Sequence, residues 1–381
     1  MDKMNRKGGL RMDQIRMGIV GLGDMALKHA RVILENIPQV RIAAVASRNT
    51  VNIERLCAME NCGEIRVFDT PAQMYESGAI DAVLIASPHR AHVAQATEAF
   101  ACGIHVLLEK PTGVYTAEVR RLGAAADASG CVFGVMLNQR THPAYRKMKE
   151  IVSSGEMGEI RRVSYAVTDW VRTAQYYVSS PWRATWKDDG GGVLLNQAPH
   201  NLDLLQWICG MPVGVRAFCG FGRWHDVEIE DDVTAYMEFA NGATGTFVTC
   251  TGEAPGSNRF EISLDGGQLV YENDRLTLKK LEMPVSRYIR ENKEPFRKPG
   301  VTITDITPDE PYPKHEGVIR AFARHILYGE PMVADGREGL NSLMLANAML
   351  LSSWTDERIA LPFDEAADER YKRLLAAKSG R

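Results

Sequence analysis

The apolar positions of the first 140 residues fall into short runs, separated by longer stretches in which they recur at helical spacing. Short runs that read as strands alternate with amphipathic stretches that read as helices. The predicted strands are 14–21, 40–46, 81–86, 104–108 and 131–138, and the predicted helices are 26–37, 91–102 and 116–129. Strands alternating with helices are typical of a doubly wound parallel sheet. The sequence therefore predicts an α/β domain of Rossmann type over residues 14–139, after a flexible tail at 1–13.

The pattern changes after residue 140. Predicted helices at 143–152 and 199–208 flank a strand at 160–171, and strands follow in close succession up to residue 280. Asn241-Gly242 joins two of them and is a strong hairpin signal. A stretch rich in proline and charge, 288–313, reads as a long loop before amphipathic helices at 316–327 and 338–354. We expect a second, α+β domain with an antiparallel sheet over residues 140–381.

Composition narrows the class of protein. A length of 381 residues suggests about two domains, and a net charge of −3 provides no field that would attract nucleic acid or an anionic membrane. The seven cysteines contain no C-x-x-C pair, which argues against a disulfide framework or a zinc site and for a reducing compartment. No apolar run approaches the length of a membrane span. We therefore expect a cytoplasmic protein without a nucleic-acid or membrane partner.

A glycine turn follows the first predicted strand. Gly21-Leu22-Gly23-Asp24-Met25-Ala26 stands between that strand and the first helix, the context in which a G-x-G-x-x-A match becomes informative. Gly21 permits the tight turn, and Gly23 lets the backbone approach a pyrophosphate. The N-terminus of the helix would face the phosphates with its partial positive charge. We predict a dinucleotide site that includes Gly21, Leu22, Gly23, Asp24 and Met25.

The end of the second predicted strand bears on the choice of cofactor. A dinucleotide-binding fold usually places an acid there to hold the ribose hydroxyls, but this chain has Ser47, Arg48 and Asn49. A hydroxyl and a guanidinium can bind a 2′-phosphate, which an acid would repel. The sequence therefore favours NADP over NAD.

The ends of two further strands carry polar residues. Ala86-Ser87-Pro88 follows one strand, with His92 near the start of the next helix, and Glu109-Lys110-Pro111 follows another. A proline stops a strand, and ligands of open α/β sheets bind just outside the carboxyl ends of the strands. His92 is either a cofactor contact or a structural residue, and it lacks the carboxylate or cysteine partners of a metal site. No metal is expected.

These motifs together resemble the glucose–fructose oxidoreductase/inositol dehydrogenase/rhizopine-catabolism (Gfo/Idh/MocA) family over nearly the whole chain. The resemblance implies that Lys110 lies beside the nicotinamide and the substrate, with Glu109 and Asn138 at the cofactor. It implies a catalytic group of lysine, acid and histidine, in which Lys110 and His200 match and Asn196 stands where the family most often has aspartate. It also implies one large, open, mostly antiparallel sheet, whose free face joins subunits into a homodimer or homotetramer.

A cluster of aromatic and arginine residues precedes the triple glycine at 190–192. Aromatic faces stack on the C–H surfaces of a polar ring, and arginines bind its hydroxyls, although such residues also occur in ordinary surface loops. The predicted substrate contacts are Trp170, Arg172, Tyr176, Arg183 and Asp203, together with Lys110, Asn196 and His200.

The resulting hypothesis is an NAD(P)-dependent dehydrogenase that oxidises a secondary hydroxyl of a sugar, an inositol or a sugar derivative. His200 would take the hydroxyl proton, and Lys110 would orient the hydroxyl and stabilise charge on its oxygen. One alternative is a glycosidase of the same family that uses NAD transiently, with the same residues. Another is a non-enzymatic sensor of a sugar or cofactor, against which the presence of both Lys110 and His200 argues.

Overall fold

The structure is a computed structural model that describes residues 14–180 and 183–380, so the predicted tail at 1–13 lies outside the described residues. The chain divides into two compact units. Of the described residues, the first contains those up to 141 together with 313–340, and the second contains those between 142 and 312 together with those from 341 onward. Each unit is built around one sheet.

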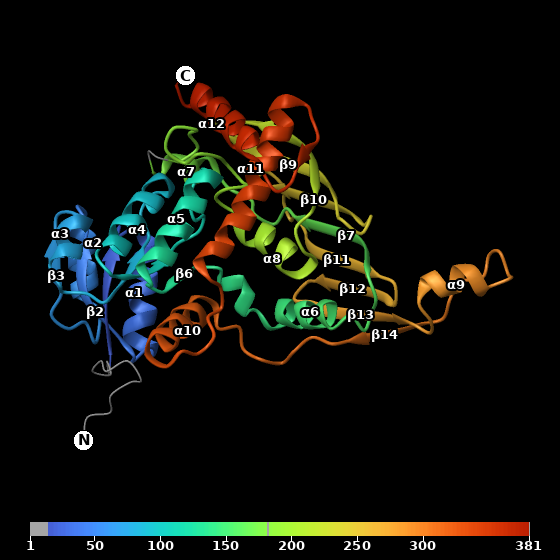
Figure 1. Ribbon diagram of the computed structural model, residues 1–381, viewed down its shortest axis with the longest axis horizontal. Coiled ribbons are helices and arrows are strands. Elements are labelled where there is room, and N and C mark those ends of the chain that lie inside the picture. Colours follow the sequence, from blue (N-terminus) through green and yellow to red (C-terminus); the bar gives the residue numbers. More distant parts are fainter. Residues whose placement is uncertain (1–13, 181–182, 381) are drawn as a thin grey trace. The chain divides into compact units, whose positions relative to one another are not determined.

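The first unit contains six strands in the order β3-β2-β1-β4-β5-β6, all paired in parallel. This order confirms the predicted doubly wound sheet (Figure 1). The carboxyl ends of β1, β4 and β5 carry the glycine turn, Ser87 and Lys110. The strands are β1 (Ile15–Val20), β2 (Val40–Ala46), β3 (Arg66–Phe68), β4 (Ala82–Ile85), β5 (His105–Leu108) and β6 (Phe133–Val135).

Helices cover both faces of this sheet. The helices of the first part of the chain are α1 (Asp24–Asn36), α2 (Thr50–Cys57), α3 (Pro71–Glu76), α4 (His92–Ala101) and α5 (Thr116–Ser129), with short 3-10 helices at His89–Ala91 and Asn138–Thr141. Apolar residues of α1 pack on one face, and those of α3, α4 and α5 pack on the other. The sequence analysis left α2, β3 and α3 unassigned. β3 has only three residues and none of them is buried, so it carries little apolar signal.

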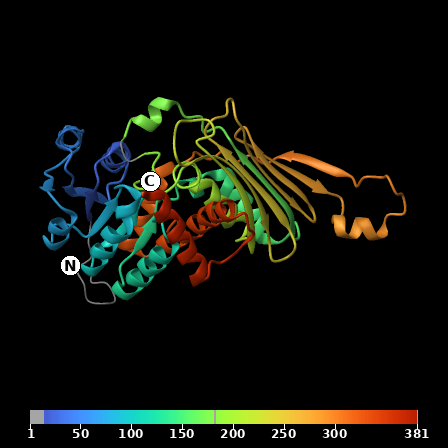
Figure 2. The same cartoon turned by 90° about the horizontal axis from the view of Figure 1, so that it is seen from above.

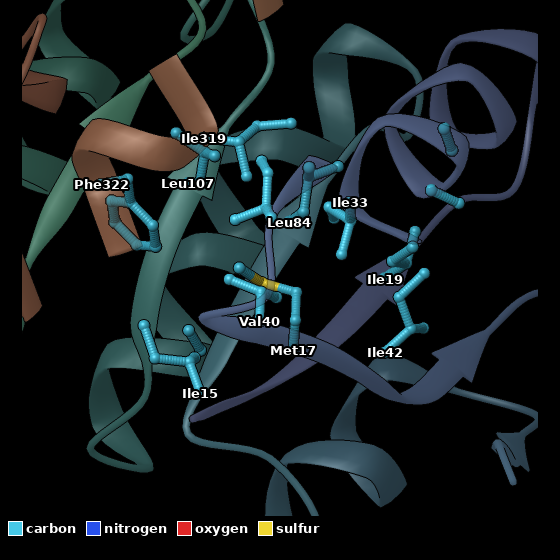
Figure 3. Close-up of a cluster of buried hydrophobic side chains, with 14 of the residues drawn as sticks. Ile15, Met17, Ile19, Ile33, Val40, Ile42, Leu84, Leu107, Ile319 and Phe322 are labelled. Carbon is cyan, nitrogen blue, oxygen red and sulfur yellow. The ribbon is translucent and has the colours of Figure 1, made fainter. Parts of the chain in front are cut away.

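A late helix returns to the first sheet. α10 (Lys314–Tyr328) buries Val318, Ile319 and Phe322 beside α1, in the cluster drawn in Figure 3. The sequence analysis expected all of 140–381 in one domain, whereas 313–340 packs with the first unit. The helical periodicity was visible in the sequence, but periodicity does not say which sheet an apolar face covers. The first crossing between units, at residues 141 and 142, lies close to the predicted boundary.

The second unit contains nine strands in the order β14-β13-β12-β11-β7-β10-β9-β8-β15. Only β7 and β10 pair in parallel, so the sheet is mostly antiparallel, as expected. The predicted Asn241-Gly242 hairpin joins β9 and β10. The strands are β7 (Ile160–Val167), β8 (Gly214–Phe221), β9 (Glu230–Glu238), β10 (Thr244–Cys250), β11 (Asn258–Leu264), β12 (Gly267–Glu272), β13 (Arg275–Leu281), β14 (Val301–Asp305) and β15 (Ile359–Ala360).

The loop predicted over 288–313 is wrong in part. The segment contains the end of α9 (Val285–Glu291) and the whole of β14, which is the edge strand of the second sheet; the stretch with α9 between β13 and β14 extends beyond that sheet (Figure 2). Every residue of β14 is exposed and no residue of α9 is buried. Without a buried face, neither element leaves a periodic apolar pattern in the sequence.

Aromatic side chains fill the core on one face of the second sheet. Tyr165 stacks on Phe260 with ring centroids 4.3 Å apart, and Asn201 of α8 donates to the Tyr165 hydroxyl at 2.6 Å. On the opposite face Phe218 and Tyr236 remain 62% and 43% exposed. The helices of this unit are α6 (Pro143–Ser154), α7 (Ala174–Val178), α8 (Pro199–Cys209), α9, α11 (Gly339–Thr355) and α12 (Glu365–Ser379). Across 14–180 and 183–380, no helix is long and apolar enough to cross a membrane.

Candidate functional site

The glycine turn is built for close contact between β1 and β4. Gly21 has φ +78°, and a Cβ there would lie 2.8 Å from backbone atoms of Ser87, so only glycine fits. Beside it, a Cβ on Gly23 would meet no atom within 4 Å, and no side chain caps the first turn of α1. Open space beside Gly23 at the uncapped, positive end of the helix dipole is suited to a pyrophosphate.

A residue that the sequence analysis missed supports this turn. Asn52 of α2 is buried and donates from Nδ2 to the carbonyl of Leu22 at 2.7 Å. Asn49 caps the start of α2, and Ser47 accepts a hydrogen bond from its backbone N–H at 3.1 Å. Arg48 is exposed. The Asn-x-x-Asn pattern after the second strand was the available signal, because asparagine is a preferred helix cap.

The buried side chain of His92 links the segments that follow β4 and β5. Its ring is fully buried, with Nδ1 2.8 Å from the carbonyl of Pro111 and Nε2 2.8 Å from the carbonyl of Ser87. Burial lowers the pKa of His92 to about 4. The neutral ring therefore donates to one carbonyl at a time. His92 thus holds the two strand ends together, as in the structural alternative, while its contact with the cofactor stays a prediction.

Glu109 is also buried, and its contact with the cofactor stays a prediction. Its Oε1 lies 2.6 Å from His29 Nε2, and its Oε2 accepts a hydrogen bond from the backbone N–H of Lys110 at 3.0 Å. Burial opposes ionisation, but the hydrogen bond from His29 and the charges of His29 and Lys110 outweigh it and lower the pKa of Glu109 to about 2. An ionised carboxylate thus anchors the residue that carries the candidate catalytic side chain. Lys110 itself is partly exposed.

In the second unit, the triple glycine lies against the start of β9. A Cβ on Gly192 would lie 1.9 Å from the carbonyl oxygen of Glu230. Glu230 Oε1 accepts hydrogen bonds from the backbone N–H groups of Gly192 (2.8 Å) and Leu194 (3.1 Å), while its carbonyl accepts from Val193 (2.9 Å). The glycine is required because the loop is held against this strand, and Glu230 holds it.

Glu230 is a second residue that sequence reasoning missed. Burial raises its pKa to about 8, and the charge of Asp189 contributes, although the backbone hydrogen bonds oppose the shift. The acid is therefore mostly protonated at neutral pH. A single acid at the start of a strand carries no local signal, because its partners lie 36 and 38 residues away in the chain.

The helix that follows the glycine loop carries His200. Pro199 opens α8, as predicted, and His200 in its first turn is partly exposed. Asn196, just before it, donates from Nδ2 to Asp189 Oδ2 at 3.3 Å. Asp203 is only 1% exposed and accepts a hydrogen bond from Gln206 at 2.9 Å. Asp203 thus lies in the interior of this unit, and its assignment as a substrate contact stays a prediction.

The predicted aromatic and arginine residues do meet one another. Arg183 lies over the ring of Tyr176 at 4.4 Å and donates to its hydroxyl at 2.5 Å. Arg172 lies over the rings of Tyr176 (5.1 Å) and Trp170 (5.6 Å). Gln197 donates to the Tyr176 hydroxyl at 3.0 Å, which links this cluster to the segment of Asn196. The four predicted residues therefore form one partly exposed cluster in the second unit.

His225 fixes the backbone of this cluster. Its Nε2 lies 2.9 Å from the carbonyl of Arg172, and its Nδ1 lies 3.0 Å from the carboxylate of buried Asp231. Asp231 also accepts hydrogen bonds from the backbone N–H groups of residues 223–225. Through His225, the loop that carries Arg172 is therefore hydrogen-bonded to Asp231 of the second sheet.

Two other features do not mark the site. A cavity of about 590 Å³ is lined by Arg16, Arg41 and Arg66 at the amino ends of β1, β2 and β3. Ligands of such sheets bind at the carboxyl ends, so we do not assign the site to this cavity. Within the described part of the chain, no group of three or more His, Cys, Asp or Glu residues could hold a metal ion.

Two family models match the chain. The model described as "Oxidoreductase family, NAD-binding Rossmann fold" matches residues 15–137, and the model described as "GFO/IDH/MocA C-terminal domain" matches residues 145–270. Together they span well over half of the chain.

Similar proteins include sugar dehydrogenases. The rhizopine catabolism protein MocA of Rhizobium meliloti is 31% identical over 199 residues, which cover 52% of this chain and 58% of that protein. The D-glucoside 3-dehydrogenase of Escherichia coli is 25% identical over 373 residues, covering 93% of this chain and all of that one. The crystal structure of the WlbA dehydrogenase from Bordetella pertussis in complex with NADH and UDP-GlcNAcA matches with a TM-score of 0.78 at 26% identity, covering 93% and 100% of the two chains.

Proposed function

Because the chain belongs to the Gfo/Idh/MocA family of oxidoreductases, we propose that it oxidises a secondary hydroxyl of a sugar, an inositol or a sugar derivative with NAD or NADP. The observation that carries the proposal is the carboxyl edge of the first sheet, where an uncapped glycine turn follows β1 and Lys110 follows β5, with β4 between these two strands. The names of the E. coli and Bordetella relatives support a carbohydrate substrate.

The cofactor would bind along the carboxyl ends of the parallel strands. Gly21, Leu22 and Gly23 would hold the pyrophosphate with the first-turn residues Asp24 and Met25. The other direct contacts proposed are Ser47, Arg48 and Asn49 at the ribose, Ala86, Ser87 and Pro88 after β4, and Asn138 after β6. When bound, the nicotinamide accepts a hydride from the carbinol carbon or returns it.

The preference for NADP over NAD rests on Arg48. Its side chain is exposed at the end of β2, and no acid stands at Ser47, Arg48 or Asn49 to repel a 2′-phosphate. We expect NADP to bind about tenfold more tightly than NAD, and Arg48→Ala to abolish the difference. Fluorescence titration of the apo protein with each cofactor measures both affinities. Tighter or equal NAD binding that Arg48→Ala leaves unchanged would refute the preference, while the pyrophosphate site would stand.

Lys110 and His200 would both act on the substrate hydroxyl, Lys110 by stabilising charge on its oxygen and His200 by accepting its proton. The positive charge of Lys110 helps to keep Glu109 ionised, and the attraction is mutual, so it favours the charged lysine. A charged lysine cannot take a proton, but it can hold the oxygen on which negative charge develops. The proton then goes to His200, because an imidazole is the side chain whose ordinary pKa lies near neutral pH.

We expect Lys110→Ala and His200→Ala each to lower kcat about a hundredfold or more, with cofactor affinity changed no more than about twofold. Lys147→Ala, which removes a partly exposed lysine from α6, serves as the control and should retain full turnover. Near-normal turnover by His200→Ala on the true substrate would show that another group takes the proton.

The substrate itself would be found with a panel of pyranoses, pyranosides and inositols, each tested with NAD and NADP at the nicotinamide absorbance. We propose that Trp170, Arg172, Tyr176 and Arg183 bind its ring. Release of the aglycone from a pyranoside without net NADH or NADPH would identify the redox glycosidase instead.

We also propose that the exposed face of the second sheet joins two copies of the chain. Phe218 and Tyr236 leave large apolar surface on adjacent strands, and such a patch commonly marks an interface. A double substitution, Phe218→Glu with Tyr236→Lys, should shift the protein toward the monomer in light scattering. A monomeric wild-type protein at micromolar concentration would contradict the assignment.

A further inference from the structure

The side chain of Asn196 is held by a buried acid from its own loop. Asn196 Nδ2 donates to Asp189 Oδ2 at 3.3 Å, and the backbone N–H of Ala184 donates to the same oxygen at 3.3 Å. Asp189 is 1% exposed, whereas Asn196 is partly exposed. The acid therefore lies on the inner side of the amide, and the amide forms the outer member of the pair.

This contact fixes the polarity of the amide. A carboxylate only accepts hydrogen bonds, so the NH₂ group of Asn196 must point toward Asp189 and its carbonyl oxygen must point elsewhere. An asparagine without such a partner can turn its amide over and present a donor instead. Asp189 thereby makes Asn196 an acceptor.

The negative charge of the loop also lies at Asp189. Burial, together with the charge of Asp189, raises the pKa of Glu230 to about 8. Asp189 before the triple glycine and Glu230 at the start of β9 are both buried acids, and Glu230 is the one that retains its proton at neutral pH. A carboxylate thus stands directly behind Asn196.

We propose that Asp189 is a positioning residue that acts through Asn196, which accepts a hydrogen bond from a hydroxyl group of the substrate. The inference rests on the proposed dehydrogenase function and extends it. The substrate would carry a hydroxyl that donates to Asn196, as the hydroxyls of a polyhydroxylated ring can. An amide cannot take the proton, so Asn196 orients the hydroxyl and proton transfer remains with His200.

Exchanging the two side chains tests the pair. Asn196→Asp brings two carboxyl groups into contact, and one of them must then hold a proton near neutral pH. Asp189→Asn removes the charge and the fixed acceptor. The double variant Asp189→Asn with Asn196→Asp restores one acid and one amide in exchanged positions. Asp188→Asn is the matched control, because Asp188 is the exposed neighbour of Asp189.

We expect each single variant to lower kcat/KM about tenfold or more on a substrate found in the pyranoside and inositol panel. Asn196→Asp should also add an ionisation between about pH 5 and pH 8 to the profile of kcat/KM against pH. The exchanged double variant should recover to within about threefold of wild type and lose that ionisation. The proposal would be overturned if the losses in kcat/KM of the two single variants added in the double variant. It would also be overturned if the pH profile of kcat/KM for Asn196→Asp were identical to that of wild type.

Thermal unfolding across pH 5–8 provides a second measurement that needs no substrate. The midpoint of Asn196→Asp should rise as the pH falls, because protonation relieves the repulsion, and the exchanged variant should not show this rise. If unfolding shows the coupling but no compound in the panel is oxidised, the pairing of the two residues stands, while the substrate contact falls together with the proposed function. If neither unfolding nor kinetics shows the coupling, the inference itself is wrong.

Discussion

Replacing the buried Glu230 by glutamine should make the protein less sensitive to pH. In an unfolded chain this glutamate has its ordinary pKa of 4.5, and in the fold burial and the charge of Asp189 raise the pKa to about 8. Between these values the folded protein holds a proton that the unfolded chain has lost. The contribution of Glu230 to stability is therefore fully present below about pH 4.5 and is lost as the pH rises through 8.

The size of the effect follows from the two pKa values. Each unit of difference is worth about 1.4 kcal/mol, so the shift from 4.5 to about 8 corresponds to a total loss of about 5 kcal/mol. Between pH 5.5 and pH 7.5 the wild-type protein should lose about 3 kcal/mol through this residue alone. Glutamine keeps an acceptor for Gly192 and Leu194 but never ionises, so Glu230→Gln should escape that loss.

Urea unfolding followed by tryptophan fluorescence at pH 5.5 and pH 7.5 measures the difference. Other titrating groups are common to both proteins and cancel when wild type and Glu230→Gln are compared at each pH. Glu238→Gln is the control, since Glu238 ends the same strand and its side chain is 39% exposed beside Arg358. If Glu230→Gln changed stability equally at both pH values, Glu230 would not be the protonated acid that the structure indicates.

Two further predictions concern the loops that hold the site. Gly192→Ala would place a Cβ 1.9 Å from the carbonyl oxygen of Glu230, so the loop must move. Turnover should then fall more than tenfold while cofactor affinity is unchanged. Gly155→Ala, at an open helix end, is the control that separates the effect of the clash from a general effect of losing a glycine. Asn52→Ala removes the hydrogen bond to Leu22 and should weaken NAD and NADP equally, about fivefold, in the fluorescence titration. A change in cofactor preference without a loss of affinity would contradict this role of Asn52.

The sequence predicted the features that depend on local chemistry. The parallel strands were visible because they are buried on both faces and read as continuous apolar runs, and β2 has the predicted bounds. Pro199 and Asn241-Gly242 mark a helix start and a hairpin because their backbone preferences act within a few residues. The cluster of Trp170, Arg172, Tyr176 and Arg183 was found because its members lie close together in the chain.

The contacts that hold the site could not be predicted in this way. His29 and Glu109 are 80 residues apart, and Gly192 and Glu230 are 38 apart. A single buried polar residue on a helix or strand does not disturb the periodic pattern of apolar residues, so the sequence does not identify its distant partner. The same limit applies to His92 and Asp203: nothing in the sequence indicated that these two side chains are buried, because burial depends on packing across the whole unit.

Two buried glutamates show how far the neighbours of a residue decide its chemistry. Glu109 has a pKa of about 2 because the hydrogen bond from His29 and the charges of His29 and Lys110 outweigh burial, whereas the pKa of Glu230 is about 8 because burial dominates and the nearest charge is another acid. Both glutamates nevertheless hold a segment of backbone in place. Glu109 accepts the backbone N–H of Lys110 in one unit, and Glu230 accepts backbone N–H groups of the glycine loop before Asn196 in the other. A carboxyl group accepts such bonds in either protonation state, but only the ionised one also attracts the cation beside it. The ionised acid is therefore found beside Lys110, and the protonated acid is found where a further negative charge would compete with Asp189.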